Sequence, residues 1–129
     1  MSMERNIIIM SESSYIIMPN NVTRIWMSEP ELVELFGVIV PTLRAAIKAV
    51  YQSGVLKEHE AQKYIRLENG YHADVLSFPM IVALAFHINS FGAEQVRNAI
   101  IERLYLRKEK TAFFFSLGIH NMNMSNYQA

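Results

Sequence analysis

Residues 26–48, WMSEPELVELFGVIVPTLRAAIK, predict a helix, a tight turn and a second helix. Ser28 and Glu31 have the spacing of a capping box, in which the hydroxyl accepts the third backbone N–H and the carboxylate accepts the N–H of the cap. We therefore expect the first helix over residues 28–36. Gly37 can adopt the left-handed backbone that ends a helix at little steric cost.

The second helix is expected over residues 41–51. Pro41 suits its first turn, because the N–H that proline lacks would have no intrahelical partner there. Apolar residues recur at helical spacing on both segments and should pack the two helices together as a helix-turn-helix. The residues expected in the core are Leu32, Phe36, Leu43, Ile47 and Leu84.

The outer side of the second helix carries Thr42, Arg44 and Lys48, and residues 40–53 contain two cations and no acid. In a helix-turn-helix protein this helix enters the major groove of DNA. The same spacing also occurs in helix pairs that only build a core, so the pattern alone leaves both interpretations open.

A hairpin is predicted directly after these helices, where residues 61–68 and 71–76 flank Asn69-Gly70. A three-residue loop with Gly70 in a left-handed conformation puts apolar residues on one face, whereas a two-residue loop mixes apolar and polar residues. The favoured register pairs Leu67 with Tyr71, Ile65 with Ala73 and Arg66 with His72. A hairpin in this position is the wing of a winged helix, and Lys63 and Arg66 would contact the DNA backbone.

Three blocks of sequence occur in a fixed order: IWMSEPELVELFGV (25–38), PTLRAAIKAVYQSGVL (41–56) and YHADVLSFPMIVALAFHINS (71–90). They resemble the RhuM-type virulence-associated proteins of bacteria, and the resemblance covers about residues 22–110. It implies a helix-turn-helix DNA-binding region and a DNA-binding or regulatory role. One departure is that Ile39 and Val40 stand where the family tends to place a small polar residue ahead of Pro-Thr.

The predicted fold class is α+β, a winged helix-turn-helix with a small N-terminal antiparallel sheet and additional C-terminal helices. Residues 6–10 and 15–18 suggest a hairpin, and residues 22–27 a third strand. Ser77 and Pro79 can begin a central, buried helix over residues 80–88, and a last helix is expected over residues 93–110. The expected organisation is one domain over residues 1–110 and a tail over 111–129, which carries an aromatic triplet.

Composition narrows the function. The chain has 129 residues, 12 basic and 12 acidic residues and no cysteine. Zero net charge argues against an indiscriminate nucleic-acid binder, so any affinity for DNA must come from local charge asymmetry. The lack of cysteine, of a signal-peptide pattern and of a long apolar stretch favours a cytoplasmic protein without membrane partners. Its four scattered histidines have no metal-ligand spacing, and we expect neither an enzyme nor a cofactor.

Two functions remain as hypotheses. The first is binding of double-stranded DNA through Thr42, Arg44, Lys48, Lys63 and Arg66, by a transcription regulator or a DNA-targeting domain. The second is a protein-interaction module on the same scaffold, because Ile39 and Val40 at the head of the second helix and zero net charge suit a protein partner. A homodimer is expected in the first case, because two-fold dimers usually read DNA half-sites.

Overall fold

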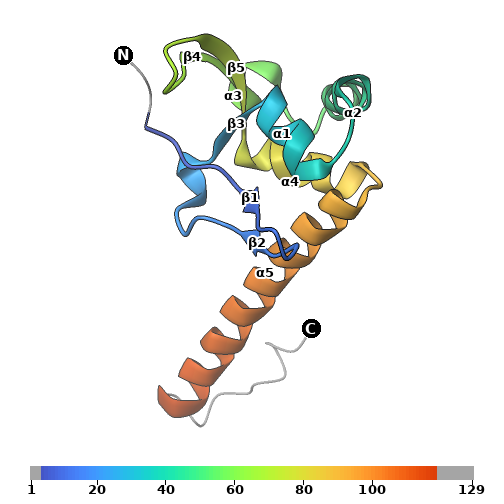
Figure 1. Cartoon of the computed structure of the whole chain (residues 1–129). Coiled ribbons are helices and arrows are strands. Elements are labelled where there is room, and N and C mark those ends of the chain that lie inside the picture. Colours follow the sequence, from blue (N-terminus) through green and yellow to red (C-terminus); the bar gives the residue numbers. More distant parts are fainter. Residues whose placement is uncertain (1–3, 119–129) are drawn as a thin grey trace. The chain divides into compact units, whose positions relative to one another are not determined.

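The computed structural model describes the backbone of residues 4–118 and the side chains of residues 4–105. It is a mixed α+β structure with two small antiparallel sheets (Figure 1). The chain divides into two units, Met1–Arg97 and Asn98–Ala129, and the candidate site lies in the first. The expected domain boundary at residue 110 stays a prediction.

The helix pair forms as expected. Helix α1 spans Glu29–Phe36, with Ser28 as its cap and Glu31 completing the capping box. The backbone N–H of Ser28 donates to Oε1 of Glu31 at 2.9 Å. Gly37 ends the helix with φ +66°, in the left-handed region that favours glycine. Figure 1 shows α1 and α2 joined by this short turn.

Helix α2 spans Val40–Ser53 and therefore begins one residue earlier and ends two residues later than expected. The helix was expected to end near residue 51, but it continues to Ser53 and ends at Gly54, which has φ +79° in the left-handed region that favours glycine. Leu32, Phe36, Leu43 and Leu84 are buried as predicted, whereas Ile47 is only half-buried because it lines a groove described below.

The three-stranded sheet contains β3 (Trp26–Ser28), β4 (Gln62–Arg66) and β5 (His72–Ser77) in the order β3-β5-β4. The hairpin has the predicted register, with Ile65 opposite Ala73 and Arg66 opposite His72. Its loop closes with the N–H of Leu67 donating to the carbonyl of Tyr71 at 2.7 Å, and Gly70 has φ +91°. The three-residue loop is thus confirmed. A one-turn helix, α3 (Glu58–Ala61), replaces the start of the expected strand.

The prediction of a third N-terminal strand over residues 22–27 is wrong for residues 22–24 and for its place in an N-terminal sheet, whereas residues 26 and 27 do form a strand. Val22–Arg24 forms a 3-10 turn, η1, because the side chain of Asn21 accepts the N–H of Thr23 and favours a turn over an extended chain. Strand β3 follows and pairs with β5, so it belongs to the sheet of the hairpin. The N-terminal hairpin itself forms, from β1 (Ile9–Met10) and β2 (Ile16–Ile17).

Helix α4 (Phe78–His87) lies at the centre of the first unit and contacts η1, α2, α3 and β5. The hydroxyl of Ser77 accepts the N–H of Met80 and caps this helix as expected. The core is built from side chains of β3, β5, α1, α2, α4 and the start of α5 (Phe91–Gly118), together with two residues outside these elements. The largest fully buried side chains are those of Ile8, Ile25, Met27, Leu32, Phe36, Leu43, Val75, Met80, Ile81, Leu84 and Val96.

Helix α5 spans Phe91–Gly118 and continues past the expected end near residue 110. No glycine or proline occurs between Gly92 and Gly118, so nothing in the sequence interrupts the helix there. The expected end of the last helix near residue 110 is therefore wrong, whereas the tail over residues 111–129 stays a prediction, and residues 119–129 lie outside the described part. The expected burial of the aromatic triplet likewise concerns side chains beyond the described ones.

Candidate functional site

Three of the predicted DNA-contacting residues, Thr42, Arg44 and Lys48, are exposed on α2. They lie on the side of the helix away from the buried residues Leu43 and Ala46. The head of α2 has no side-chain cap, since its cap residue is Ile39, and this isoleucine is 67% exposed. The exposed face of α2 therefore begins with an apolar group and continues with polar and cationic ones.

Arg44 is paired with a carboxylate that sequence reasoning did not connect to it. Its guanidinium donates to Glu29, with Nε 3.1 Å from Oε2 and Nη2 3.0 Å from Oε1. The hydrogen bonds and charge of Glu29 raise the pKa of Arg44 above its ordinary value. Any new partner of Arg44, such as a base edge or a phosphate, would have to compete with Glu29.

A groove of about 620 Å³ separates α2 from the sheet, and we call it the α2 groove. Arg44 and Lys48 line it from α2, and Glu29, Glu58 and Asp74 line it from α1, α3 and β5. The charges that line this groove are therefore mixed. Within the described part of the chain no carboxylate lies within ion-pair distance of Lys48, so this ammonium group is open to an external anion.

Tyr51 connects α2 to the sheet at this groove. Its hydroxyl donates to Oε1 of Gln62 on β4 at 3.0 Å. Burial raises the pKa of Tyr51, and the negative charges of Glu58 and Asp74 raise it further. The hydroxyl thus stays protonated and can act as the donor that ties the helix to the hairpin.

The structure separates the two cations predicted on the hairpin. Side chains alternate between the faces of a strand, so Lys63 and Arg66, three residues apart, lie on opposite faces. Arg66 shares its face with Tyr64 and His72, whose rings stack with centroids 5.6 Å apart. Lys63 instead has its Nζ 4.4 Å from the ring centroid of Trp26, a cation–π contact.

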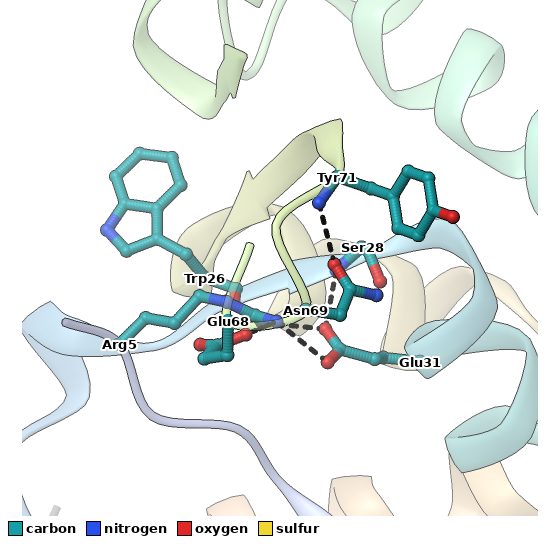
Figure 2. Close-up of polar contacts among 7 residues, drawn as sticks. All are labelled: Arg5, Trp26, Ser28, Glu31, Glu68, Asn69 and Tyr71. Atoms are coloured by element: carbon teal, nitrogen blue, oxygen red, sulfur yellow. Dashed lines mark hydrogen bonds and ion pairs between the residues drawn. The ribbon is translucent and has the colours of Figure 1, made fainter. Parts of the chain in front are cut away.

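A buried arginine that the sequence did not single out lies beside this hairpin (Figure 2). The side chain of Arg5 is only 3% exposed. It pairs with both oxygens of Glu31 at 2.7 and 2.9 Å, with Glu68 at 3.0 Å and with the carbonyl of Trp26 at 2.8 Å. We call these four residues the Arg5 cluster.

Electrostatics within the Arg5 cluster favour the charged forms. Burial raises the pKa of Glu31, but the hydrogen bonds from Arg5 and Ser28 and the charge of Arg5 outweigh burial, so this pKa lies below its ordinary value. The hydrogen bond to Glu31 raises the pKa of Arg5. No local sequence signal predicts the cluster, because Arg5 is 26 residues from Glu31 and 63 residues from Glu68.

Among the residues described, no group of three or more histidines and carboxylates is placed to hold a metal ion. None of the helices in the same part of the chain is both long enough and apolar enough to cross a membrane.

Comparison with protein-family models, with curated proteins and with solved structures finds no match to this chain. The resemblance to RhuM-type proteins therefore stays a prediction.

Proposed function

We propose that the first unit is a winged-helix domain that binds double-stranded DNA, with α2 in the major groove and the β4–β5 hairpin as the wing. One observation carries the proposal. The hairpin follows the helix pair after the one-turn helix α3 and shares a sheet with the strand that precedes the pair, in the order β3-β5-β4. This topology sets the hairpin beside the exposed face of α2, with a groove between them.

Each exposed residue has a role under this proposal. Thr42 lies in the first turn of α2, and residues at the start of a recognition helix contact base edges. Lys48 contacts a phosphate as a point charge. Arg66 contacts the backbone from the wing, on the hairpin face that it shares with Asp74 of the groove. Lys63 lies on the opposite face over Trp26 and contributes less.

Charge limits the affinity of this interface. Glu29, Glu58 and Asp74 line the same groove as Arg44 and Lys48, and the chain as a whole carries no net charge. Phosphate contacts supply most of the sequence-independent binding free energy, and salt weakens them. Binding by one copy is therefore weak and salt-sensitive, and a homodimer that joins two such faces would strengthen it.

The first experiment titrates fluorescently labelled duplex DNA with the protein at low and moderate salt. Replacing Lys48 with alanine should weaken binding to all sequences alike and reduce the salt slope by about 1. Replacing Arg44 with alanine should relax the preference at one base position. If the protein has no affinity for duplex DNA even at low salt, the proposal fails.

A second experiment uses the ion pair of Arg44. Glu29→Gln removes the carboxylate that occupies Arg44 and one negative charge from the groove, so duplex affinity should rise. Glu34→Gln is the matched control, because Glu34 is an exposed residue of the same helix that does not line the groove. Equal gains from both substitutions would mean that only net charge matters, and no gain from Glu29→Gln would place DNA away from α2.

The second candidate function is protein interaction through the head of α2. Ile39 and Val40 are 67% and 39% exposed and form an apolar surface that DNA does not need. Ile39→Ser should leave duplex affinity unchanged if α2 reads DNA, because isoleucine offers no hydrogen bond. If that substitution instead abolishes self-association in sedimentation experiments while no duplex affinity exists, the interaction module replaces the DNA-binding proposal.

A further inference from the structure

Arg5 joins three elements that are far apart in the sequence. Its guanidinium reaches the carbonyl of Trp26 on β3, the carboxylate of Glu31 in the first turn of α1 and the carboxylate of Glu68 in the hairpin loop (Figure 2). The backbone holds this side chain in place, because the N–H of Asn6 donates to the carbonyl of Arg24 at 2.8 Å. One side chain thus links the start of the helix pair to the tip of the wing.

The tip of the wing has little other support from the sheet. Strand β3 is three residues long and pairs only with Val75–Ser77 at the base of β5. The pairs from Tyr64–Asp74 to Arg66–His72 therefore belong to a two-stranded ribbon, beyond the reach of the third strand. Two-stranded hairpins are marginally stable in water. A contact at the loop has a large influence on where such a ribbon points.

The chemistry of the contact requires arginine. A guanidinium presents its donors in a planar fork, which allows it to bond both oxygens of Glu31 and still reach Glu68 and a carbonyl. A lysine ammonium offers three donors at one point and cannot match this geometry. The Arg5 side chain is almost fully buried and Glu31 is 26% exposed, so their charge-assisted bonds are partly shielded from water, whereas Glu68 is 61% exposed and its bond to Arg5 is open to solvent and salt.

We propose that Arg5 is a positioning residue that fixes the tip of the β4–β5 hairpin against the first turn of α1, and so sets the orientation of the wing relative to α2. The positioning role concerns the protein alone. Only its consequence for binding, that a loosened wing lowers duplex affinity, rests on the proposed DNA-binding function.

The orientation of the β4–β5 hairpin relative to α2 can be followed as the distribution of distances between two spin labels, measured by pulsed electron paramagnetic resonance. The chain contains no cysteine, so Gln52→Cys on α2 and Tyr71→Cys on the hairpin supply the only two labelling sites, and both positions are exposed. In this background Arg5→Gln and Glu68→Gln should each broaden the distance distribution. Glu68→Gln is the milder variant, because it leaves the Arg5–Glu31 pair and the capping box intact.

The control is Arg24→Gln, which removes an arginine whose ion-pair partner among the described residues is exposed Glu4, at 3.5 Å, and not a residue of the β4–β5 hairpin. Its distance distribution should match that of the parent. An unchanged width in both Arg5→Gln and Glu68→Gln would overturn the proposal, as would equal broadening in Arg24→Gln.

Amide exchange separates positioning from a general loss of stability. In Glu68→Gln the N–H groups of Leu67 and Gly70, which close the loop, should exchange about tenfold faster, while those of α4 keep their rates. Equal acceleration in α4 would mean that the cluster only stabilises the fold, which would refute the positioning role.

Duplex titration adds the functional readout. If Glu68→Gln loosens the hairpin and lowers affinity, both proposals hold. If it loosens the hairpin while the parent protein has no affinity for DNA, the DNA-binding proposal fails and the positioning role stands.

Discussion

Gly92 offers a decisive test of how α5 is attached to the helix pair. It is the second residue of α5 and is buried against the end of α1. The preceding turn is docked there as well, because the hydroxyl of Ser90 donates to the carbonyl of Phe36 at 2.7 Å and accepts the N–H of Ala93 at 3.1 Å. The replacement Gly92→Ala adds one methyl group at this junction.

The sign of the stability change distinguishes packing from helix propensity. In an ordinary helix position, alanine stabilises relative to glycine by about 1 kcal/mol. Here the new Cβ would lie 2.7 Å from the carbonyl carbon and oxygen of Phe36 and would also clash with the carbonyl oxygen of Leu35, whereas ordinary contacts begin at 3.4 Å. These are backbone atoms, so no rotamer change can relieve the clash. We expect a net loss of about 1 to 3 kcal/mol, the usual cost of overpacking.

The assay is urea unfolding followed by circular dichroism, with the midpoint and slope compared between variants. Asn98→Ala is the matched control, because it places alanine at an exposed position of the same helix and should be neutral or slightly stabilising. If Gly92→Ala raises the midpoint as much as Asn98→Ala does, the close approach of α5 to α1 is wrong.

Two further predictions concern stability and one concerns assembly. Leu43 is fully buried, so Leu43→Ala should cost about 2 to 5 kcal/mol in urea unfolding, whereas Thr42→Ala on the exposed side of α2 should stay within about 0.5 kcal/mol. Folding lowers the pKa of Glu31 below its ordinary value of 4.5. The ionised carboxylate therefore contributes to the free energy of unfolding above pH 4.5, and this contribution is lost as the pH falls through the lowered pKa. As the pH falls below 4.5, the urea midpoint should drop more steeply for the parent than for Glu31→Gln. Equal pH dependence of the two midpoints would contradict the ion pair with Arg5. Sedimentation should show a homodimer, and a monomer at high micromolar concentration would contradict two-fold binding to DNA.

The sequence predicted those parts of the fold that depend on residues close together in the chain. The capping box of Ser28 and Glu31, the helix end at Gly37 and the hairpin loop at Gly70 each follow from side chains within four residues of one another. The register of the hairpin was also predictable, because only one alignment separates apolar from polar faces. These local rules hold before any tertiary contact forms.

The ion pairs were not predictable, because they depend on which elements the fold brings together. Glu29 and Arg44 are 15 residues apart, and they meet only because α1 and α2 pack across the turn. Arg5 lies 63 residues from Glu68, a separation at which charge patterning carries no information. Strand β3 was assigned to the wrong sheet for the same reason, since its pairing with β5 is a long-range contact.

The first turn of α1 explains how these charges work together. Glu29 binds Arg44 of α2, and Glu31, two residues later, binds Arg5, which also binds Glu68 in the loop of the β4–β5 hairpin. Both carboxylates also lie at the positive end of the helix dipole, which stabilises their negative charge. The two pairs differ in exposure: Arg44 is 67% exposed and Glu29 33%, whereas Arg5 is 3% exposed and Glu31 26%, so solvent weakens the Arg44 pair more. The first turn of α1 therefore connects to Arg5 and the β4–β5 hairpin loop through Glu31, and to α2 through the solvent-exposed pair of Glu29 with Arg44.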